Sequence, residues 1–107
     1  AEELYREALK IRRELAEKSP DAYLPNLAIG CNNLANLLSD IGSFKEAEEL
    51  YQEALKIRRN LAEENPKVYL PKLQLVCDNL TALLEKTGRR EEADNLRREV
   101  AEFFKLQ

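Results

Sequence analysis

The sequence predicts an all-α solenoid, in which antiparallel helix pairs stack one on another. It repeats itself after 46 residues, and periods of roughly 20–50 residues are typical of stacked arrays. Apolar residues recur every three or four positions, as on one face of an α-helix. Only three Gly and four Pro interrupt the 107 residues, and no segment alternates apolar and polar residues as a strand does.

The repeat is strongest at the start of the chain. Residues 1–17 (AEELYREALKIRRELAE) align with residues 47–63 (AEELYQEALKIRRNLAE) and differ at two positions only. The register then continues to Gly42, which aligns with Gly88. A third copy begins at Ala93 and soon diverges. We therefore expect one repeating unit of two helices, used about two and a half times.

The first helix (about 1–18) and the third (about 44–64) share one apolar pattern. In the third helix its members are Ala47, Leu50, Tyr51, Ala54, Ile57 and Leu61. Asn65-Pro66 is expected to end this helix, because a residue before proline disfavours helical geometry.

The second helix (about 24–41) and the fourth (about 70–87) also correspond. The apolar face of the second is Leu27, Cys31, Leu34, Leu38 and Ile41. We expect Pro25 and Pro71 in the first turns of these helices, where a missing N–H costs nothing. Gly42 is expected to cap the second helix in a left-handed conformation, and Ser43 to be the N-cap of the third.

The fifth helix (about 89–105) closes the predicted array. Leu96, Val100, Phe103 and Phe104 form its inner side. Its other positions are polar, as expected of a helix whose outer face meets water.

Residues 33–55 (NLANLLSDIGSFKEAEELYQEAL) resemble a tetratricopeptide repeat. The small residues Ala35, Ala47 and Ala54 stand where that family needs close helix approach, and Gly42 also fits. The NNLA run at 32–35 and the extended second helix are similar to the lengthened repeats of kinesin light chains and their bacterial and archaeal relatives. The period of 46 exceeds the roughly 34 residues usual in the family.

The resemblance implies a single domain over residues 1–107. In it, 1–18 is the second helix of a truncated repeat, 19–64 a complete repeat and 65–107 the last repeat. The third copy departs from the family pattern, with Thr81 in place of a small residue and Arg90 in place of an aromatic one.

In this family the first helices of the repeats line a concave groove that binds peptides or proteins. Periodicity places twelve side chains on the face opposite the Leu34/Leu38 stripe. They are Ile29, Asn32, Asn33, Asn36, Ser39 and Asp40 in the second helix, and Leu75, Asp78, Asn79, Ala82, Glu85 and Lys86 in the fourth.

Asparagine is the informative residue type in this set. One amide offers a donor and an acceptor to an extended peptide backbone, and Asn33 and Asn79 are equivalent in successive repeats. The alternative is that these amides bridge neighbouring helices or face water.

The charges of the predicted groove favour a neutral or basic ligand. Asp40, Asp78 and Glu85 are opposed by Lys86, so charge complementarity disfavours an acidic peptide. Tetratricopeptide domains that hold a chaperone's C-terminal carboxylate carry Lys and Arg beside their Asn residues. Asn32 and Asp78 stand at the counterpart positions, and we expect no such clamp.

Helix 1–18 predicts a second surface. Leu4, Ala8, Ile11 and Leu15 form an apolar stripe whose partner helix would precede residue 1. Stripes of this size are seldom left in water. We expect either a homo-oligomer formed through this helix or a missing helix supplied by the natural context.

Composition excludes several kinds of chemistry. The chain contains no His, which rules out a Ser-His-Asp triad, His-ligated metal and imidazole catalysis. Three scattered Gly cannot form a phosphate-binding loop. The carboxylate pairs lie on helix surfaces that we expect to be solvated, where nothing raises a carboxyl pKa for acid–base work. We therefore expect no enzyme, cofactor or bound metal.

Charge and hydropathy exclude further partners. A net charge of −3 disfavours nucleic acid, and no apolar stretch approaches the roughly 20 residues of a membrane span. Cys31 and Cys77 are expected to be buried small side chains, and the setting is expected to be cytoplasmic. The repeated Arg12-Arg13 and Arg58-Arg59 pairs are expected to face solvent, and the reason for Gly30 inside a helix stays open.

Overall fold

The computed structural model describes residues 2–107, which form five α-helices and no strand. The helices are α1 (Glu2–Lys18), α2 (Pro20–Asp40), α3 (Phe44–Glu64), α4 (Pro66–Lys86) and α5 (Arg90–Leu106). The predicted all-α class is confirmed. Within the described residues, none of the helices combines the length and apolar character that a bilayer crossing requires.

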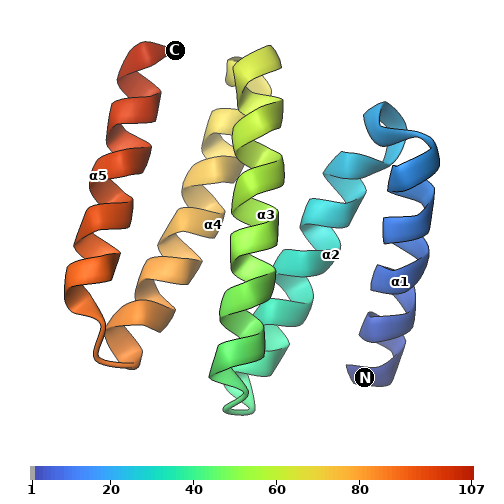
Figure 1. The fold of residues 1–107 in the computed structure, drawn as a ribbon, viewed down its shortest axis with the longest axis horizontal. Helices are drawn as coiled ribbons and strands as arrows, with labels where there is room; N and C mark the ends of the chain where they lie inside the picture. Colours follow the sequence, from blue (N-terminus) through green and yellow to red (C-terminus); the bar gives the residue numbers. More distant parts are fainter. Residues whose placement is uncertain (1) are drawn as a thin grey trace.

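The helices form a slab of two layers that measures 34 × 34 × 16 Å. Helices α1, α3 and α5 lie in one layer, and α2 and α4 lie behind them (Figure 1). Each helix packs on the next along the chain, and α2 also touches α4. Helices α1 and α5 stand at opposite ends, so the stack is an open solenoid.

The core lies between the two layers and follows the predicted apolar stripes except at Ile41, which is 57% exposed because it lies past the end of α2. Its largest fully buried side chains are Cys31, Leu34, Leu38, Leu73, Val76, Cys77 and Leu80. Ala35, Ala47 and Ala54 are also fully buried. Small side chains at these three positions let α2 and α3 approach closely.

The two glycine turns are built alike and confirm the expected cap. Gly42 and Gly88 have φ values of 87° and 80°, in the left-handed region that favours glycine. The Gly42 N–H donates to the Ser39 carbonyl at 3.2 Å, and the Ser43 N–H donates to the Leu38 carbonyl at 2.8 Å. This bond pair closes the C-terminus of α2 and turns the chain into α3.

The starts of α2 and α4 differ from the expectation. These helices begin at Pro20 and Pro66, so Pro25 and Pro71 lie in the second turn and not in the first. Proline has the fixed φ that the first helical position needs, and Pro20 and Pro66 take that position. The later prolines lack the N–H that would bond four residues back. The carbonyls left without this bond belong to Asp21 and Lys67, which are exposed, so water can hydrate them.

Candidate functional site

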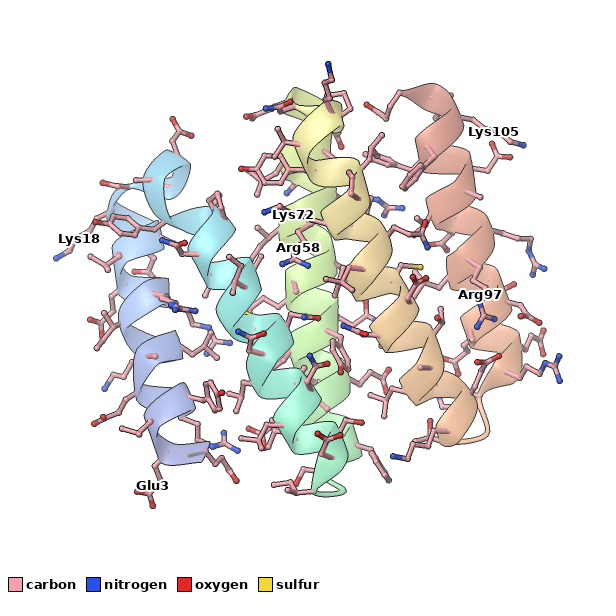
Figure 2. All side chains as sticks on the ribbon, turned by 180° about the vertical axis from the view of Figure 1, so that it is seen from behind. Glu3, Lys18, Arg58, Lys72, Arg97 and Lys105 are labelled. Carbon is pink, nitrogen blue, oxygen red and sulfur yellow. The ribbon has the colours of Figure 1, made fainter. Side chains whose placement is uncertain are left out.

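The predicted groove residues lie on α2 and α4, in the layer turned toward the viewer in Figure 2. Ile29 and Leu75, which are equivalent in the repeat, are 38% and 51% exposed. Ser39 and Asn79 are half-buried and Asn32 is buried. The other exposed members are Asn33, Asn36, Asp40, Asp78, Ala82, Glu85 and Lys86.

Asn32 does not face a groove as expected. It is 6% exposed, and its side-chain oxygen accepts a hydrogen bond of 3.1 Å from Nδ2 of Asn79. A buried amide requires such a partner. Asn79 therefore bridges α4 and α2, the alternative noted for it above, whereas Asn33 and Asn36 are exposed on α2.

Asn36 is also engaged inside the molecule. Its side-chain oxygen accepts a hydrogen bond from the hydroxyl of Tyr51, which is 3% exposed. Burial, reinforced by the nearby charge of Asp40, raises the pKa of Tyr51 to about 12. The hydroxyl therefore remains a donor, and Asn36 keeps its amide N–H groups for a ligand.

The charged groups of this face differ in their partners. Glu85 forms an ion pair of 3.1 Å with Arg97 of α5. Asp78 accepts a hydrogen bond of 2.8 Å from the neutral amide of Gln74, so its charge is not cancelled. Lys86 lies 5.3 Å from the ring centroid of Phe44. The uncompensated negative charge on this face therefore includes Asp78.

The apolar stripe of α1 is exposed where its copy on α3 is covered. Leu4 is 71% exposed and its equivalent Leu50 only 6%. Tyr5 is 44% exposed and its equivalent Tyr51 only 3%. Ile11 is 56% exposed, whereas Ala8 and Leu15 are half-buried. The predicted stripe is thus open to solvent, most of all near Leu4.

A cleft of about 380 Å³ follows this stripe. It is lined by Leu4, Tyr5, Ala8, Arg12, Gly30 and Asn33. A Cβ atom on Gly30 would lie 2.7 Å from Nη1 of Arg12. Glycine there makes room for the Arg12 side chain, which donates to the Asn26 carbonyl at 3.3 Å.

Arg58, the repeat equivalent of Arg12, does not face solvent as expected. It is 5% exposed, and Nη1 donates to the Lys72 carbonyl at 3.1 Å; the two residues are labelled side by side in Figure 2. Desolvation lowers the pKa of its guanidinium. Sequence reasoning missed this contact, although Arg12 and Arg58 recur at one repeat position and bond equivalent carbonyls.

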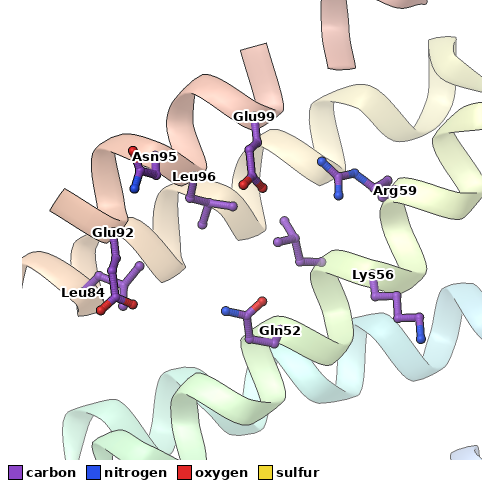
Figure 3. Close-up of a pocket in the computed structure, with 9 residues that line it drawn as sticks. Gln52, Lys56, Arg59, Leu84, Glu92, Asn95, Leu96 and Glu99 are labelled. Atoms are coloured by element: carbon purple, nitrogen blue, oxygen red, sulfur yellow. The ribbon is translucent and has the colours of Figure 1, made fainter. Parts of the chain in front are cut away.

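The clefts between α1 and α3, and between α3 and α5, are also equivalent. Arg6 pairs with Glu46, and Arg13 pairs with Glu53 at 2.6 Å, across the first cleft. Across the second, a cleft of about 330 Å³, Arg59 and Glu99 stand at the equivalent positions (Figure 3). The Arg59 guanidinium lies 5.5 Å from the ring centroid of Phe103.

The two thiols are held away from water. Cys31 and Cys77 are free and buried, and burial raises their pKa values to about 12 and about 11. Thiolates, the reactive form of cysteine, are therefore disfavoured. In residues 2–107 no three His, Cys, Asp or Glu side chains are grouped so that they could hold a metal ion.

Residues 27–66 match the family model of the tetratricopeptide repeat. The match covers most of α2, its glycine turn and the whole of α3. The sequence matches no curated protein. The 46-residue repetition carries the same helices and the same glycine turn beyond the matched segment. By this match, residues 27–66 contain a tetratricopeptide repeat, and the helices on either side of it continue the same architecture.

Proposed function

We propose that this chain binds a peptide or protein segment along the exposed face of α2 and α4. Tetratricopeptide repeats generally take part in protein–protein interactions and are typically non-catalytic. The observation that carries the proposal is the repeated exposure of Ile29 and Leu75. An apolar side chain in water at equivalent positions of both repeats has no role in the core of the slab.

The residues beside this apolar pair suit an extended peptide. Asn33 stands one helical turn beyond Ile29 and is exposed. Asn36 keeps its amide N–H groups, since only its oxygen is bonded to Tyr51. Amide donors bind the carbonyls of an extended backbone, and apolar side chains of the ligand then contact Ile29 and Leu75.

The charges of the face support a neutral or basic ligand. Asp78 is hydrogen-bonded to the neutral amide of Gln74, whereas the charge of Glu85 is compensated by Arg97. An exposed carboxylate attracts a basic peptide and repels an acidic one, and salt screens both interactions. Binding of a basic peptide should therefore weaken as the salt concentration rises.

A random peptide library tests this proposal. Selection on the wild-type chain should enrich neutral or basic sequences. The double variant Ile29→Ser, Leu75→Ser should bind them about tenfold less well, because burial of two apolar side chains is lost. Leu106, which is 80% exposed on α5 and therefore outside the face of α2 and α4, gives the matched control Leu106→Ser, which should bind as the wild type does. Enrichment of acidic peptides, or equal binding by the double variant, would contradict the proposal.

The exposed stripe of α1 favours a second candidate, association through that helix. Leu4 and Ile11 are more exposed than their copies on α3, so covering them releases ordered water. Light scattering after size-exclusion chromatography should give a mass above that of one chain at high concentration. The variant Leu4→Glu, Ile11→Glu should remain a monomer. A monomeric wild type at all concentrations would exclude self-association.

The state of the cysteines fits a cytoplasmic setting, which we also propose. Both thiols are unpaired, as is usual in compartments that keep cysteine reduced.

A further inference from the structure

We infer that the stripe of α1 binds an amphipathic helix with the residue pattern of α2, running antiparallel to α1. The inference concerns the same α1 surface as the second candidate above and assigns it a different occupant. It differs from self-association because α1 does not carry the α2 pattern.

The protein contains its own template for this contact. The α3 residues Leu50, Tyr51 and Ala54 are equivalent to Leu4, Tyr5 and Ala8 of α1. On α3 all three are buried, and the preceding helix α2 packs against that helix. The same side chains in the same order on α1 present a surface like that of α3, to which α2 contributes the contact of Asn36 with Tyr51. The partner of α1 therefore needs the features with which α2 covers α3.

The most specific of these features is a hydrogen-bond acceptor for a tyrosine hydroxyl. On α3, Tyr51 donates its hydroxyl proton to the side-chain oxygen of Asn36. Tyr5 is the equivalent hydroxyl on α1 and lines the open cleft. A buried hydroxyl without a partner costs free energy, so the bound helix should place an Asn or a similar acceptor against Tyr5. Apolar residues two positions to either side in the sequence complete the pattern, as Leu34 and Leu38 do in α2.

The cleft beside the stripe extends the match to a second polar contact. Gly30 leaves space in α2, and the Arg12 guanidinium lies in it. One of its nitrogens donates to the Asn26 carbonyl. Arg12 also lines the cleft, where its remaining N–H groups can donate to a bound helix. A partner that made apolar contacts alone would leave these N–H groups of Arg12 without an acceptor.

A synthetic peptide of residues 20–40, the sequence of α2, is the probe. Labelled at its N-terminus, it should bind the full chain saturably with one peptide per chain, measured by fluorescence anisotropy under reducing conditions. Leu4→Glu should weaken binding at least tenfold, since a carboxylate would replace a buried leucine. Leu106, which is 80% exposed on α5, gives the matched control Leu106→Glu, which should leave binding unchanged. Circular dichroism should show both variants folded, because both leucines are exposed.

A double-mutant cycle tests the hydroxyl contact itself. Tyr5→Phe in the protein and Asn36→Ala in the peptide should each weaken binding about threefold to tenfold, the usual range for one hydrogen bond. Together they should cost little more than either alone, because they remove the same contact. Additive losses would overturn the assignment of Tyr5 to this contact.

Three outcomes would overturn the inference as a whole. The first is no saturable binding up to about 1 mM peptide. The second is binding that Leu4→Glu does not weaken, since the peptide would then lie elsewhere. The third is a dimer that Leu4→Glu disperses and the peptide does not, which would make a second copy the occupant. The variants Ile29→Ser and Leu75→Ser should leave this binding intact, so failure of the groove proposal is distinguishable from failure here.

Discussion

At the scale of single residues, neighbours decide what an identical side chain does. Arg58 is buried and bonds a backbone carbonyl, whereas Arg12 bonds the equivalent carbonyl from a half-buried position. The sequence around the two is almost the same. The difference arises because α3 is packed between two helices and α1 lies at the end of the stack.

The buried thiols predict how stability changes with alkaline pH. The pKa values of Cys31 and Cys77 are raised above 9 by burial, to about 12 and about 11. Above about pH 9 the unfolded chain releases thiol protons that the folded chain retains. The unfolded state then binds fewer protons, so the free energy of unfolding falls as pH rises. The contribution is fully present below pH 9 and is lost as pH rises through 11 to 12.

Urea unfolding followed by circular dichroism between pH 8 and pH 11 checks this dependence. The variant Cys31→Ala, Cys77→Ala should be less stable at neutral pH because of the lost packing. Its stability should nevertheless decline less steeply above pH 9 than that of the wild type. Parallel curves for the two proteins would show that the thiols do not cause the decline.

Single-residue assignments in the candidate site were only partly predictable. The periodicity of α2 predicts that Asn33 and Asp40 are exposed, because helix phase alone determines which face they occupy. It failed for Asn32, since the partner amide Asn79 lies 47 positions away in the chain. It also failed for Arg58, whose burial depends on neighbouring helices.

At the scale of the helices, glycine has opposite roles inside α2 and at its end. Gly42 holds a φ of 87°, which costs a residue with a side chain about 1–2 kcal/mol. Gly30 lies inside the helix, where alanine is favoured by about 1 kcal/mol. The Cβ of an alanine there would meet the flexible end of Arg12, which can move away.

Alanine substitution should therefore change stability in opposite directions at the two sites. We expect Gly42→Ala to lower the free energy of unfolding by about 1 kcal/mol and Gly30→Ala to leave it unchanged or raise it. Thermal and urea unfolding of the two variants measure the difference. A marked loss of stability in Gly30→Ala would mean that the Arg12 position is more rigidly held than its contacts indicate.

Helix identity was more predictable than helix starts. The five helices follow from repeat and periodicity, and the ends at Gly42 and Gly88 follow from glycine's access to positive φ. The starts of α2 and α4 were placed four residues late, because each segment offers two prolines. The fixed φ of proline suits the first helical position at either proline. The structure shows that Pro20 occupies the first position of α2 and that Pro25 lies in its second turn.

At the scale of the whole molecule, cooperation between helices is local. Each helix packs on its sequence neighbours, and the ends of the slab do not meet. In such arrays stability is a sum of unit and nearest-neighbour contributions. Helix α3 packs on α2 and α4, whereas α1 packs on α2 and adds ion pairs to α3.

Hydrogen exchange should reveal this gradient. We expect the slowest amide exchange in α3 and faster exchange in α1 and α5, since end helices open at lower free energy. Mass spectrometry of peptide fragments measures the order. Equal protection of all five helices would indicate that the slab unfolds as one cooperative unit.

The residues before α2 and α4 adopt the same backbone geometry, with φ −140° and ψ 76° at both Ser19 and Asn65. The backbone therefore enters α2 and α4 with the same geometry. A second copy of residues 19–64, inserted directly after the first, would meet the same backbone conformation at both of its ends. Copying of this stretch within the gene would lengthen the slab by one hairpin and add another exposed apolar position equivalent to Ile29.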